Sequence, residues 1–247
     1  MSSYREDLAH INDAGFSDFA HGASPGLLAL LRREGVKNGL VVDLGCGSGH
    51  WARTLTDAGY EVLGVDLSPA QIQLAKQRAP NARFETESLL TVAIPACNAI
   101  TAIGEIVNYQ FDPKHSRAAL SRLFRHAYKA LRPGGVFIFD IATPARVPAE
   151  VPANYWKEGA DWSIHVEVDG NPASHWLTRK IVTFRKGKEG HYRRSEETHR
   201  LRLLEPSEIS AELTSIGFQT KVQPNYGRFR LYPGLQALIA RKPSVNS

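Results

Sequence analysis

Residues suited to ligand chemistry gather in the stretch 41–55, which reads VVDLGCGSGHWARTL. Three glycines, at positions 45, 47 and 49, follow Asp43 at every second position. Glycine lets a backbone turn tightly and approach a ligand with no Cβ in the way. The helix expected after them would present its N-terminal N–H groups and the positive end of its dipole to that ligand. The stretch therefore predicts a ligand cradle built from Asp43, Gly45, Gly47 and Gly49.

The acids near this cradle indicate which ligand it holds. A dinucleotide loop of the form GxGxxG would need a glycine at His50, and a carboxylate at Asp43 would repel its pyrophosphate. Asp43 suits an ammonium group instead. Asp66 ends the next expected strand, where a carboxylate can accept both hydroxyls of a ribose. A nucleoside with an amino-acid tail fits both acids, which predicts S-adenosylmethionine as cofactor and S-adenosylhomocysteine as product.

Four segments together resemble the Rossmann-like, class I S-adenosylmethionine-dependent methyltransferases, in their small-molecule branch. They are DLGCGSG at 43–49, VLGVD at 62–66, LRPGG at 131–135 and LQALIARKP at 235–243. The resemblance is good over residues 40–140 and loose over 206–243. It implies a seven-stranded sheet whose last strand is antiparallel. It also implies that the three glycines line the methionine end of the cofactor and that Asp66 binds the ribose.

The resemblance implies further cofactor contacts at the next strands. Members of the family often carry an acid near the end of the third strand, where it accepts a hydrogen bond from the adenine amino group. Here that segment is ETESLL, so Ser88 or the backbone of Leu89 takes this place. Leu67, next to Asp66, and Gly104, at the end of the fourth strand, complete the expected cofactor-binding residues.

Candidate catalytic residues lie beside the expected methyl donor. Glu105 and Tyr109 belong to the segment GEIVNY, at the carboxyl end of the fourth strand. A carboxylate there can orient an amine or accept its proton, or it can simply bond the cofactor or a helix end. His199 is the third catalytic candidate, and His165 and Tyr192 could also close the pocket. Methyl transfer is an in-line displacement that needs a base only when the nucleophile carries a proton.

Strands and helices alternate along the first 145 residues, which predicts an α/β, doubly wound parallel sheet. The expected strands are 40–45, 61–66, 82–86, 99–104 and 136–142, with helices at 50–59, from Pro69, and at 116–131. The helix at Pro69 has a clear start, because Ser68 can cap it and Gln71 closes a capping box. Ligands in such sheets lie beyond the carboxyl ends of the strands, where strand order reverses.

The chain divides into three expected regions. Residues 1–39 form an N-terminal helical flap that carries Tyr4, Phe16 and Phe19. Residues 40–145 and 205–247 form the methyltransferase core, with a last helix at 206–216 and final strands at 219–224 and 235–243. Residues 146–204 form a small antiparallel β insertion, at the acceptor side or in a dimer contact. It begins with a proline-rich linker, and its strands are expected at 163–170, 174–187 and 191–205.

Charge raises a second functional class. The 247-residue chain has a net charge of +5, while residues 179–202 hold nine Lys or Arg against three Glu, a net of +6. An RNA-directed methyltransferase or RNA-binding module could use this segment, although aromatic residues are not interleaved in it as an RNA-stacking platform would need and no NPPY-like tetrad occurs. A solvated strand face is the preferred interpretation. A third class, an NAD-dependent oxidoreductase, is disfavoured by His50 and by the lack of a Tyr-x-x-x-Lys pair.

The remaining expectations concern setting and partners. The two cysteines, Cys46 and Cys97, form no CxxC, so neither a disulfide framework nor a metal site is expected. No apolar run approaches the roughly 20 residues that span a bilayer, so no membrane association and a cytoplasmic location are expected. The expected partner is a small-molecule acceptor, with nucleic acid disfavoured, for a monomer or homodimer. The identity of the acceptor, and methylation at N, O or C, stay open.

Overall fold

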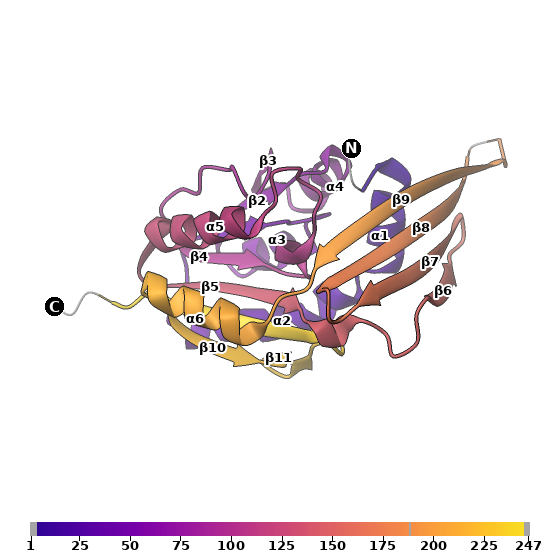
Figure 1. The fold of residues 1–247 in the computed structure, drawn as a ribbon. Coiled ribbons are helices and arrows are strands. Elements are labelled where there is room, and N and C mark those ends of the chain that lie inside the picture. The colour runs from indigo at the N-terminus through magenta and orange to yellow at the C-terminus, as the bar shows by residue number, and fades with distance from the viewer. Residues whose placement is uncertain (1–3, 188, 245–247) are drawn as a thin grey trace.

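The structure, a computed structural model, describes residues 4–187 and 189–244 as a central sheet flanked by helices, with a second sheet beside it (Figure 1). The central sheet consists of β1 (Leu40–Leu44), β2 (Glu61–Asp66), β3 (Arg83–Thr86), β4 (Cys97–Ala102), β5 (Leu131–Ala142), β10 (Gln219–Gln223) and β13 (Leu235–Arg241). Their spatial order is β10-β13-β5-β4-β1-β2-β3.

Strand directions confirm the predicted fold class. Strands β1 to β5 pair in parallel, whereas β13 runs antiparallel to both β5 and β10. The strand order reverses between β1 and β4, because β2 and β3 lie on one side and β5 on the other. The crevice at this reversal is where open α/β sheets bind ligands.

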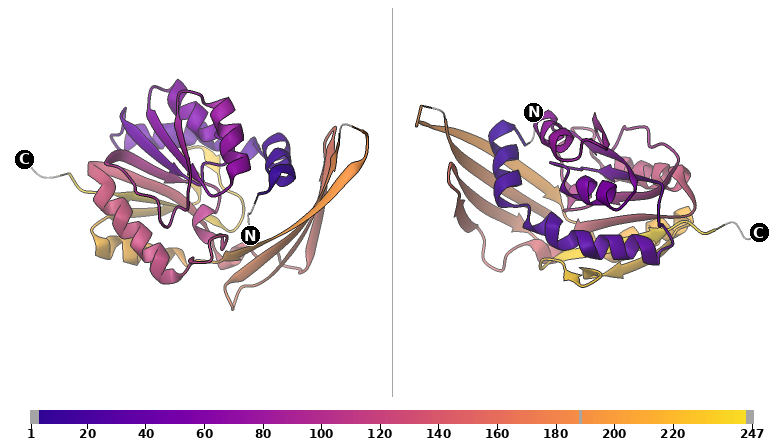
Figure 2. Two further views of the ribbon diagram at one scale, coloured as in Figure 1. Left: turned by 90° about the horizontal axis from the view of Figure 1, so that it is seen from above. Right: turned by 180° about the vertical axis from the view of Figure 1, so that it is seen from behind.

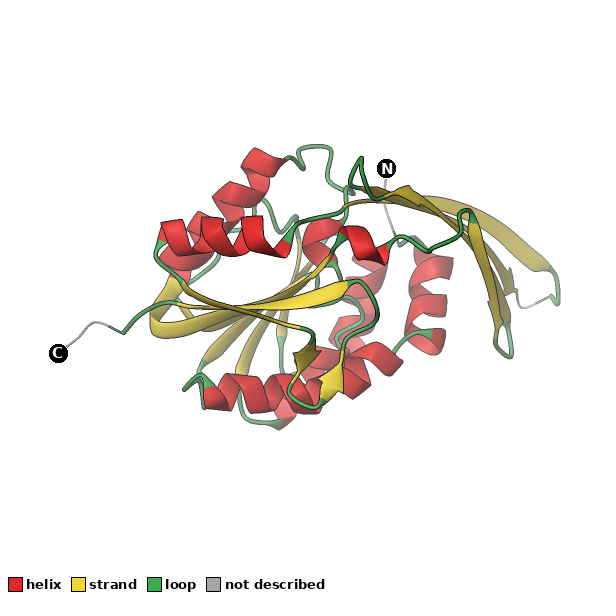
Figure 3. Ribbon diagram, turned by 60° about the horizontal axis from the view of Figure 1, so that its bottom comes forward, coloured by secondary structure: helices red, strands yellow, loops and turns green. Residues whose placement is uncertain are grey.

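Helices cover both faces of the central sheet (Figure 3). They are α1 (Glu6–Gly15), α2 (Asp18–Arg33), α3 (His50–Asp57), α4 (Pro69–Arg78), α5 (Arg117–Ala130) and α6 (Pro206–Ile216). Successive side chains along a strand point to opposite faces of the sheet, so each strand contributes to the packed layers on both faces. Val41 of β1 belongs to the cluster that α2 and α3 complete, and its neighbour Val42 to the cluster of α5 and α6. The predicted N-cap of α4 is confirmed, since Ser68 Oγ accepts from the Gln71 N–H at 3.3 Å. The predicted capping box is wrong, because the Ser68 N–H donates to Asp66 Oδ1 and Gln71 Oε1 has no partner among the described residues.

The insertion forms a four-stranded antiparallel sheet in chain order that extends away from the core (Figure 2, left). Its strands are β6 (Ala153–Glu158), β7 (Trp162–Asn171), β8 (Trp176–Lys186) and β9 (Tyr192–Arg202). Three of them were predicted. Strand β6 was not, because it is an edge strand whose side chains are nearly all exposed and show no apolar alternation. The expected linker before it contains one short helix, η2 (Pro144–Arg146).

The two N-terminal helices take different places (Figure 2, right). Helix α2 packs on the core, while α1 contacts α4 and the strands β7 and β8 of the insertion. Leu8 and Ile11 of α1 are buried in one cluster with Ile164 of β7. Asp7 is 5% exposed and is held by Arg193 Nε at 2.6 Å. Helix α1 therefore joins the core to the insertion.

Two smaller features differ from the predicted elements. Strand β5 begins at Leu131, five residues before the predicted 136, because Leu131 already pairs with Cys97 across a register shift. A short hairpin, β11 (Asn225–Tyr226) and β12 (Phe229–Arg230), lies against α2 and was not predicted. None of the helices described in residues 4–187 and 189–244 combines the length and apolar character needed to cross a membrane.

Candidate active site

Two connected cavities lie at the carboxyl ends of the parallel strands. The larger, of about 600 Å³, is bounded by the core loops, the N-terminal helices and the insertion sheet. The smaller, of about 70 Å³, lies beside the loops after β2 and β3. Residues common to both linings are Tyr4, Gly45, Asp66, Ile106 and Tyr109. The position of the cavities agrees with the site predicted from the sequence pattern.

The glycine loop has the geometry of a cradle. Gly45, Gly47 and Gly49 have φ angles of +71°, +52° and +80°, in the left-handed region that favours glycine. A Cβ on Gly45 would come within 2.4 Å of Ile106, so this glycine permits close packing. A Cβ on Gly47 would meet nothing within 4 Å, and Gly47 lines the larger cavity. The loop therefore leaves its backbone open to a ligand.

Asp66 joins this cradle to the next loop. Its Oδ2 accepts from the Gly47 N–H at 2.9 Å, and its Oδ1 accepts from the Ser68 N–H at 2.8 Å. Burial raises the pKa of Asp66 in spite of these bonds. A carboxylate offers about four acceptor positions, so two remain for other donors. Leu67 lines the smaller cavity at this point and is 38% exposed.

A second buried acid faces the larger cavity. Asp43 is 3% exposed, and its Oδ1 accepts from Thr101 Oγ1 at 2.7 Å. Burial raises the pKa of Asp43 to about 7, and the charge of Asp66 contributes to the rise. Gln71 Oε1 is a further buried acceptor near the cradle, with no hydrogen-bond partner among the described residues. This set of acceptors fits a ligand that carries an ammonium group and hydroxyls, as S-adenosylmethionine does.

The smaller cavity contains an acid that the sequence analysis missed. Ser88 and Leu89 line it, as do Phe111 and Asp112. Ser88 Oγ donates to Asp112 Oδ2 at 2.5 Å, so the serine hydroxyl proton is already engaged. Asp112 and Glu87 thus both present carboxylates to this cavity, and each accepts a hydrogen bond from Ser88. The separation of 24 residues between Asp112 and Ser88 hid this acid from pattern analysis.

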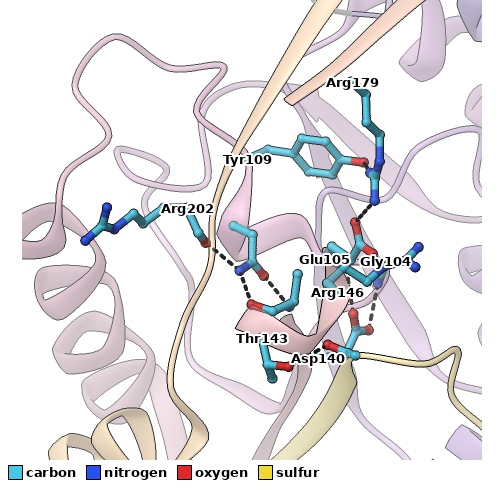
Figure 4. A network of polar contacts seen from close by, with 11 residues as sticks. Gly104, Glu105, Tyr109, Asp140, Thr143, Arg146, Arg179 and Arg202 are labelled. Atoms are coloured by element: carbon cyan, nitrogen blue, oxygen red, sulfur yellow. Dashed lines mark hydrogen bonds and ion pairs between the residues drawn. The ribbon is translucent and has the colours of Figure 1, made fainter. Parts of the chain in front are cut away.

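A sharp turn after β4 aims Glu105 at the larger cavity (Figure 4). Gly104 and Glu105 have φ angles of +94° and +62°. Their backbone N–H groups donate to the carboxylate of Asp140 at 2.7 and 2.6 Å, and Tyr226 Oη donates to the same carboxylate at 2.7 Å. Burial raises the pKa of Asp140 to about 6. The two backbone bonds fix the turn to strand β5, and the bond from Tyr226 holds the carboxylate that accepts them.

The carboxylate of Glu105 lies between two arginines (Figure 4). Arg146 Nε donates to Oε1 at 2.7 Å, and a terminal nitrogen of Arg179 donates to Oε2 at 2.8 Å. The other terminal nitrogen of Arg179 donates to Tyr109 Oη at 2.9 Å. Burial alone would raise the pKa of Glu105, but Arg179 and Arg146 outweigh it and lower that pKa. A carboxylate held in this way is a weak proton acceptor and well suited to hold the arginines.

Neither arginine was predicted to be a site residue. Arg146 lies in the proline-rich segment that was expected to be a linker, and Arg179 lies in the basic segment. A signal for Arg179 existed, because Leu177, Arg179 and Ile181 alternate along β8 and all three line the larger cavity. An inward-facing arginine between two apolar neighbours is uncommon on a solvated strand face.

His199 is the third predicted catalytic residue, and it also lines the larger cavity. It is 2% exposed, and its Nε2 lies 3.0 Å from Glu197 Oε2. The Tyr4 ring lies 4.9 Å from the imidazole, centroid to centroid. Tyr4 also donates its N–H to Glu197 Oε2 at 2.8 Å and accepts from Ser68 Oγ at 2.8 Å. The N-terminus thereby links strand β9 to the Asp66 loop.

Two of the residues expected to close the pocket do not line it. On β7, Ile164 and Val166 face the larger cavity, so His165 between them points to the opposite face of the sheet. Tyr192 lies at the far end of β9 and is 55% exposed. The prediction for His165 and Tyr192 was wrong, because the alternation and length of these strands carry both away from the cavity.

The basic segment 179–202 occupies strands β8 and β9, and much of its charge is matched inside the chain. Acidic or aromatic partners face these seven of its nine cations: Arg179, Lys180, Arg185, Arg193, Arg194, Arg200 and Arg202. Arg200 and Arg202 lie over the ring of Trp176, at 4.6 and 5.2 Å from its centroid. These partners account for most of the segment without a nucleic acid.

Comparisons with known proteins identify the proteins that this chain resembles. Residues 41–135 match a family described as a methyltransferase domain. A dTDP-3-amino-3,6-dideoxy-alpha-D-glucopyranose N,N-dimethyltransferase of Streptomyces fradiae is 24% identical over 241 residues, which cover 91% of this chain and 88% of that protein.

Two solved structures share the fold over nearly the whole chain. An S-adenosylmethionine-dependent methyltransferase from Clostridium acetobutylicum superposes with a TM-score of 0.79 at 20% identity, covering 96% of this chain and 98% of that one. The S-adenosylmethionine-bound amino pentose methyltransferase CalS10 from Micromonospora echinaspora has a TM-score of 0.72 at 18% identity and covers 95% of both chains. Residues 41–135 of this chain therefore match a methyltransferase domain, and the chain as a whole has the fold of these S-adenosylmethionine-dependent methyltransferases.

Proposed function

We propose that this methyltransferase acts on a nitrogen or oxygen atom of a small molecule bound in the larger cavity. The main support for the proposal is the larger cavity. It has a volume of about 600 Å³ and extends from the glycine cradle to the insertion sheet. Pockets of roughly 300–1,000 Å³ are typical of small-molecule sites. Asp43, Gly47 and Asp66 line its cofactor end, and strands β7 to β9 line its far end.

The residues of the cradle and the smaller cavity suit the cofactor. Asp43 and Gln71 offer acceptors for an ammonium group, and Asp66 offers acceptors for ribose hydroxyls. Ser88, Leu89 and Asp112 line the space proposed for the adenine. With S-adenosylmethionine bound there, a lone pair of the acceptor would attack the sulfonium methyl carbon in line, and the C–S bond would break as the new bond forms, so that S-adenosylhomocysteine leaves.

The far end of the cavity has two tasks in this proposal. Ile164, Val166 and Ile181 form an apolar wall that excludes water. Tyr109 and Arg179 offer polar contacts that orient the acceptor. His199, bonded to Glu197, is the residue proposed to hold a proton when the nucleophile releases one.

The names of related proteins favour nitrogen as the methylated atom. The relative from Streptomyces fradiae is named as an N,N-dimethyltransferase of an amino sugar, and CalS10 as an amino pentose methyltransferase. Both cover more than nine-tenths of this chain, including the insertion that closes the cavity. An amine is therefore the first acceptor type to test.

The test is a methyl-transfer screen with the purified full chain. Amino sugars, other amines and phenols are incubated with S-adenosylmethionine, and formation of S-adenosylhomocysteine and of a methylated product is followed by mass spectrometry. We expect turnover with a small molecule and its loss in Asp66→Asn. If the protein methylated tRNA and none of the small molecules, the RNA-directed alternative would replace this proposal.

A further inference from the structure

Two arginines and one glutamate form the polar centre of the larger cavity. Arg146, Arg179 and Glu105 all line it, with side chains that are 27%, 13% and 7% exposed. Two guanidinium groups face one carboxylate, so the cluster carries one positive charge in excess. Cations withdrawn from water in this way are normally paired, because an unpaired buried charge is costly.

The excess charge is concentrated on Arg146. Both terminal nitrogens of Arg179 are engaged, one with Glu105 and the other with Tyr109. Arg146 uses only its Nε, toward Glu105. Its two terminal nitrogens have no acceptor within residues 4–187 and 189–244. The fork of N–H groups on Arg146 is therefore available to a ligand.

Other charges around the cavity leave this excess in place. Asp140 lies behind the turn and is occupied by its three donors. Asp43 and Asp66 belong to the cofactor end. Asp18 also lines the cavity, and its negative charge is offset by the positive charge of Lys157, which lines the cavity as well. The acceptor end thus stays cationic.

The wall that the insertion sheet adds to this cavity is largely apolar. Val166, Val168 and Leu177 of the insertion sheet are all less than 10% exposed and line the same cavity. Tyr155 of β6 and Pro148 complete this part of the wall. A ligand that matches both features has an apolar body and one acidic group.

We propose that the methyl acceptor carries an acidic group, a carboxylate or a phosphate ester, and that Arg146 binds it through its two terminal nitrogens. The planar guanidinium fork matches both anions in a bidentate arrangement. Glu105 holds Arg146 through Nε and so directs the fork, which makes Glu105 a positioning residue. This inference rests on the proposed function, since it assigns the acceptor to the larger cavity.

Binding of simple fluorinated probes tests the inference without methyl transfer. Full-length protein saturated with S-adenosylhomocysteine is titrated with 4-fluorobenzoate, 4-fluorophenyl phosphate and the neutral 4-fluorobenzyl alcohol, followed by ¹⁹F NMR. We expect at least one acidic probe to bind about tenfold or more tightly than the alcohol. The two acidic probes distinguish a carboxylate from a phosphate.

Variants assign the preference to Arg146. Arg146→Gln is expected to reduce the ratio of acid to alcohol affinity to within about twofold of unity. Arg146→Lys keeps a charge beside Glu105 without the fork, so the ratio is expected to fall at least threefold. Arg194→Gln, on the exposed surface of β9, is the matched control and is expected to keep the full ratio.

Three results would overturn the inference. The first is equal binding of the acidic probes and the alcohol by the unaltered protein. The second is an undiminished preference for the acidic probes in both Arg146 variants. The third is a tenfold loss of affinity for S-adenosylhomocysteine in Arg146→Gln. The last would assign the arginine to the carboxylate of the cofactor. A protein that prefers acids through Arg146 yet methylates no small molecule would contradict the proposed function alone.

Discussion

The carboxylate of Asp140 accepts a hydrogen bond from the backbone N–H of Glu105 at 2.6 Å. Glu105 has a φ of +62°, a conformation that costs an L-residue roughly 1–2 kcal/mol. The bond from strand β5 offsets this cost. A buried acid in the core thereby determines where the acid in the cavity points.

Tyr226→Phe tests the support under this turn. The change removes a 2.7 Å hydrogen bond to Asp140, and bonds to charged groups contribute about 1.5–3 kcal/mol, so the free energy of unfolding should fall by that amount. Tyr128→Phe, where the described residues give the hydroxyl no hydrogen bond, is the control. Denaturant unfolding measures both, and equal stability of the two variants would contradict the argument.

Glu105→Gln should be strongly destabilising. The carboxylate is the anion between Arg146 and Arg179, and removing one partner of a buried ion pair costs about 3–5 kcal/mol. The double variant Glu105→Gln with Arg146→Gln should recover part of this loss, because it removes a cation as well. Thermal unfolding of the four proteins in this cycle gives the coupling. Strictly additive effects would show that the pair contributes no coupling energy.

Asp66→Asn should weaken binding of S-adenosylhomocysteine at least tenfold. The substitution keeps the side-chain volume but removes the charge and one of the two acceptor oxygens from a group proposed to bind two hydroxyls. Asp57→Asn, an exposed acid paired with Arg53, should leave affinity unchanged. Calorimetric titration decides, and an unaltered affinity for Asp66→Asn would refute the ribose assignment.

Asp43 should make cofactor affinity depend on pH. Its pKa in the folded protein is about 7, so the carboxyl is increasingly protonated as the pH falls below 7. An ammonium group is bound by the ionised form, so affinity should rise with pH from 5.5 to about 7 and then level off, by up to about tenfold per pH unit. Asp43→Asn should flatten the curve. If the affinity of Asp43→Asn for the cofactor still rose with pH, the pH dependence would belong to another titratable group.

Helix α1 should become protected when cofactor binds. Tyr4 lines both cavities, and Phe16 and Phe19 line the larger one, at the two ends of α1 and the start of α2. Hydrogen exchange with and without S-adenosylhomocysteine should show slower exchange in α1 and no change in α6, which lies away from the cavities. Equal exchange of α1 in both states would make the N-terminal region a packed helix pair rather than a flap.

The sequence by itself determined the core fold and its cofactor end. Alternating strands and helices, the GxGxG loop and Asp66 lie within short stretches of chain, where local geometry fixes what each residue can do. The cap at Ser68 and the tight turns at the glycines are properties of a few neighbouring residues, and the structure has the cap and left-handed φ angles at all three glycines.

The end of the cavity proposed for the acceptor was decided by tertiary structure. Glu105, Arg146 and Arg179 come from three separate segments and meet only because the insertion folds back over the turn after β4. The contact of Asp112 with Ser88 likewise joins two segments that are 24 residues apart in the chain. The strand register decided that Arg179 faces the cavity and His165 does not, since a shift of one residue exchanges the two faces of a strand. Spacing along the chain carries no information about contacts between distant segments, and these contacts set the charge at the end of the cavity where the acceptor is proposed to bind.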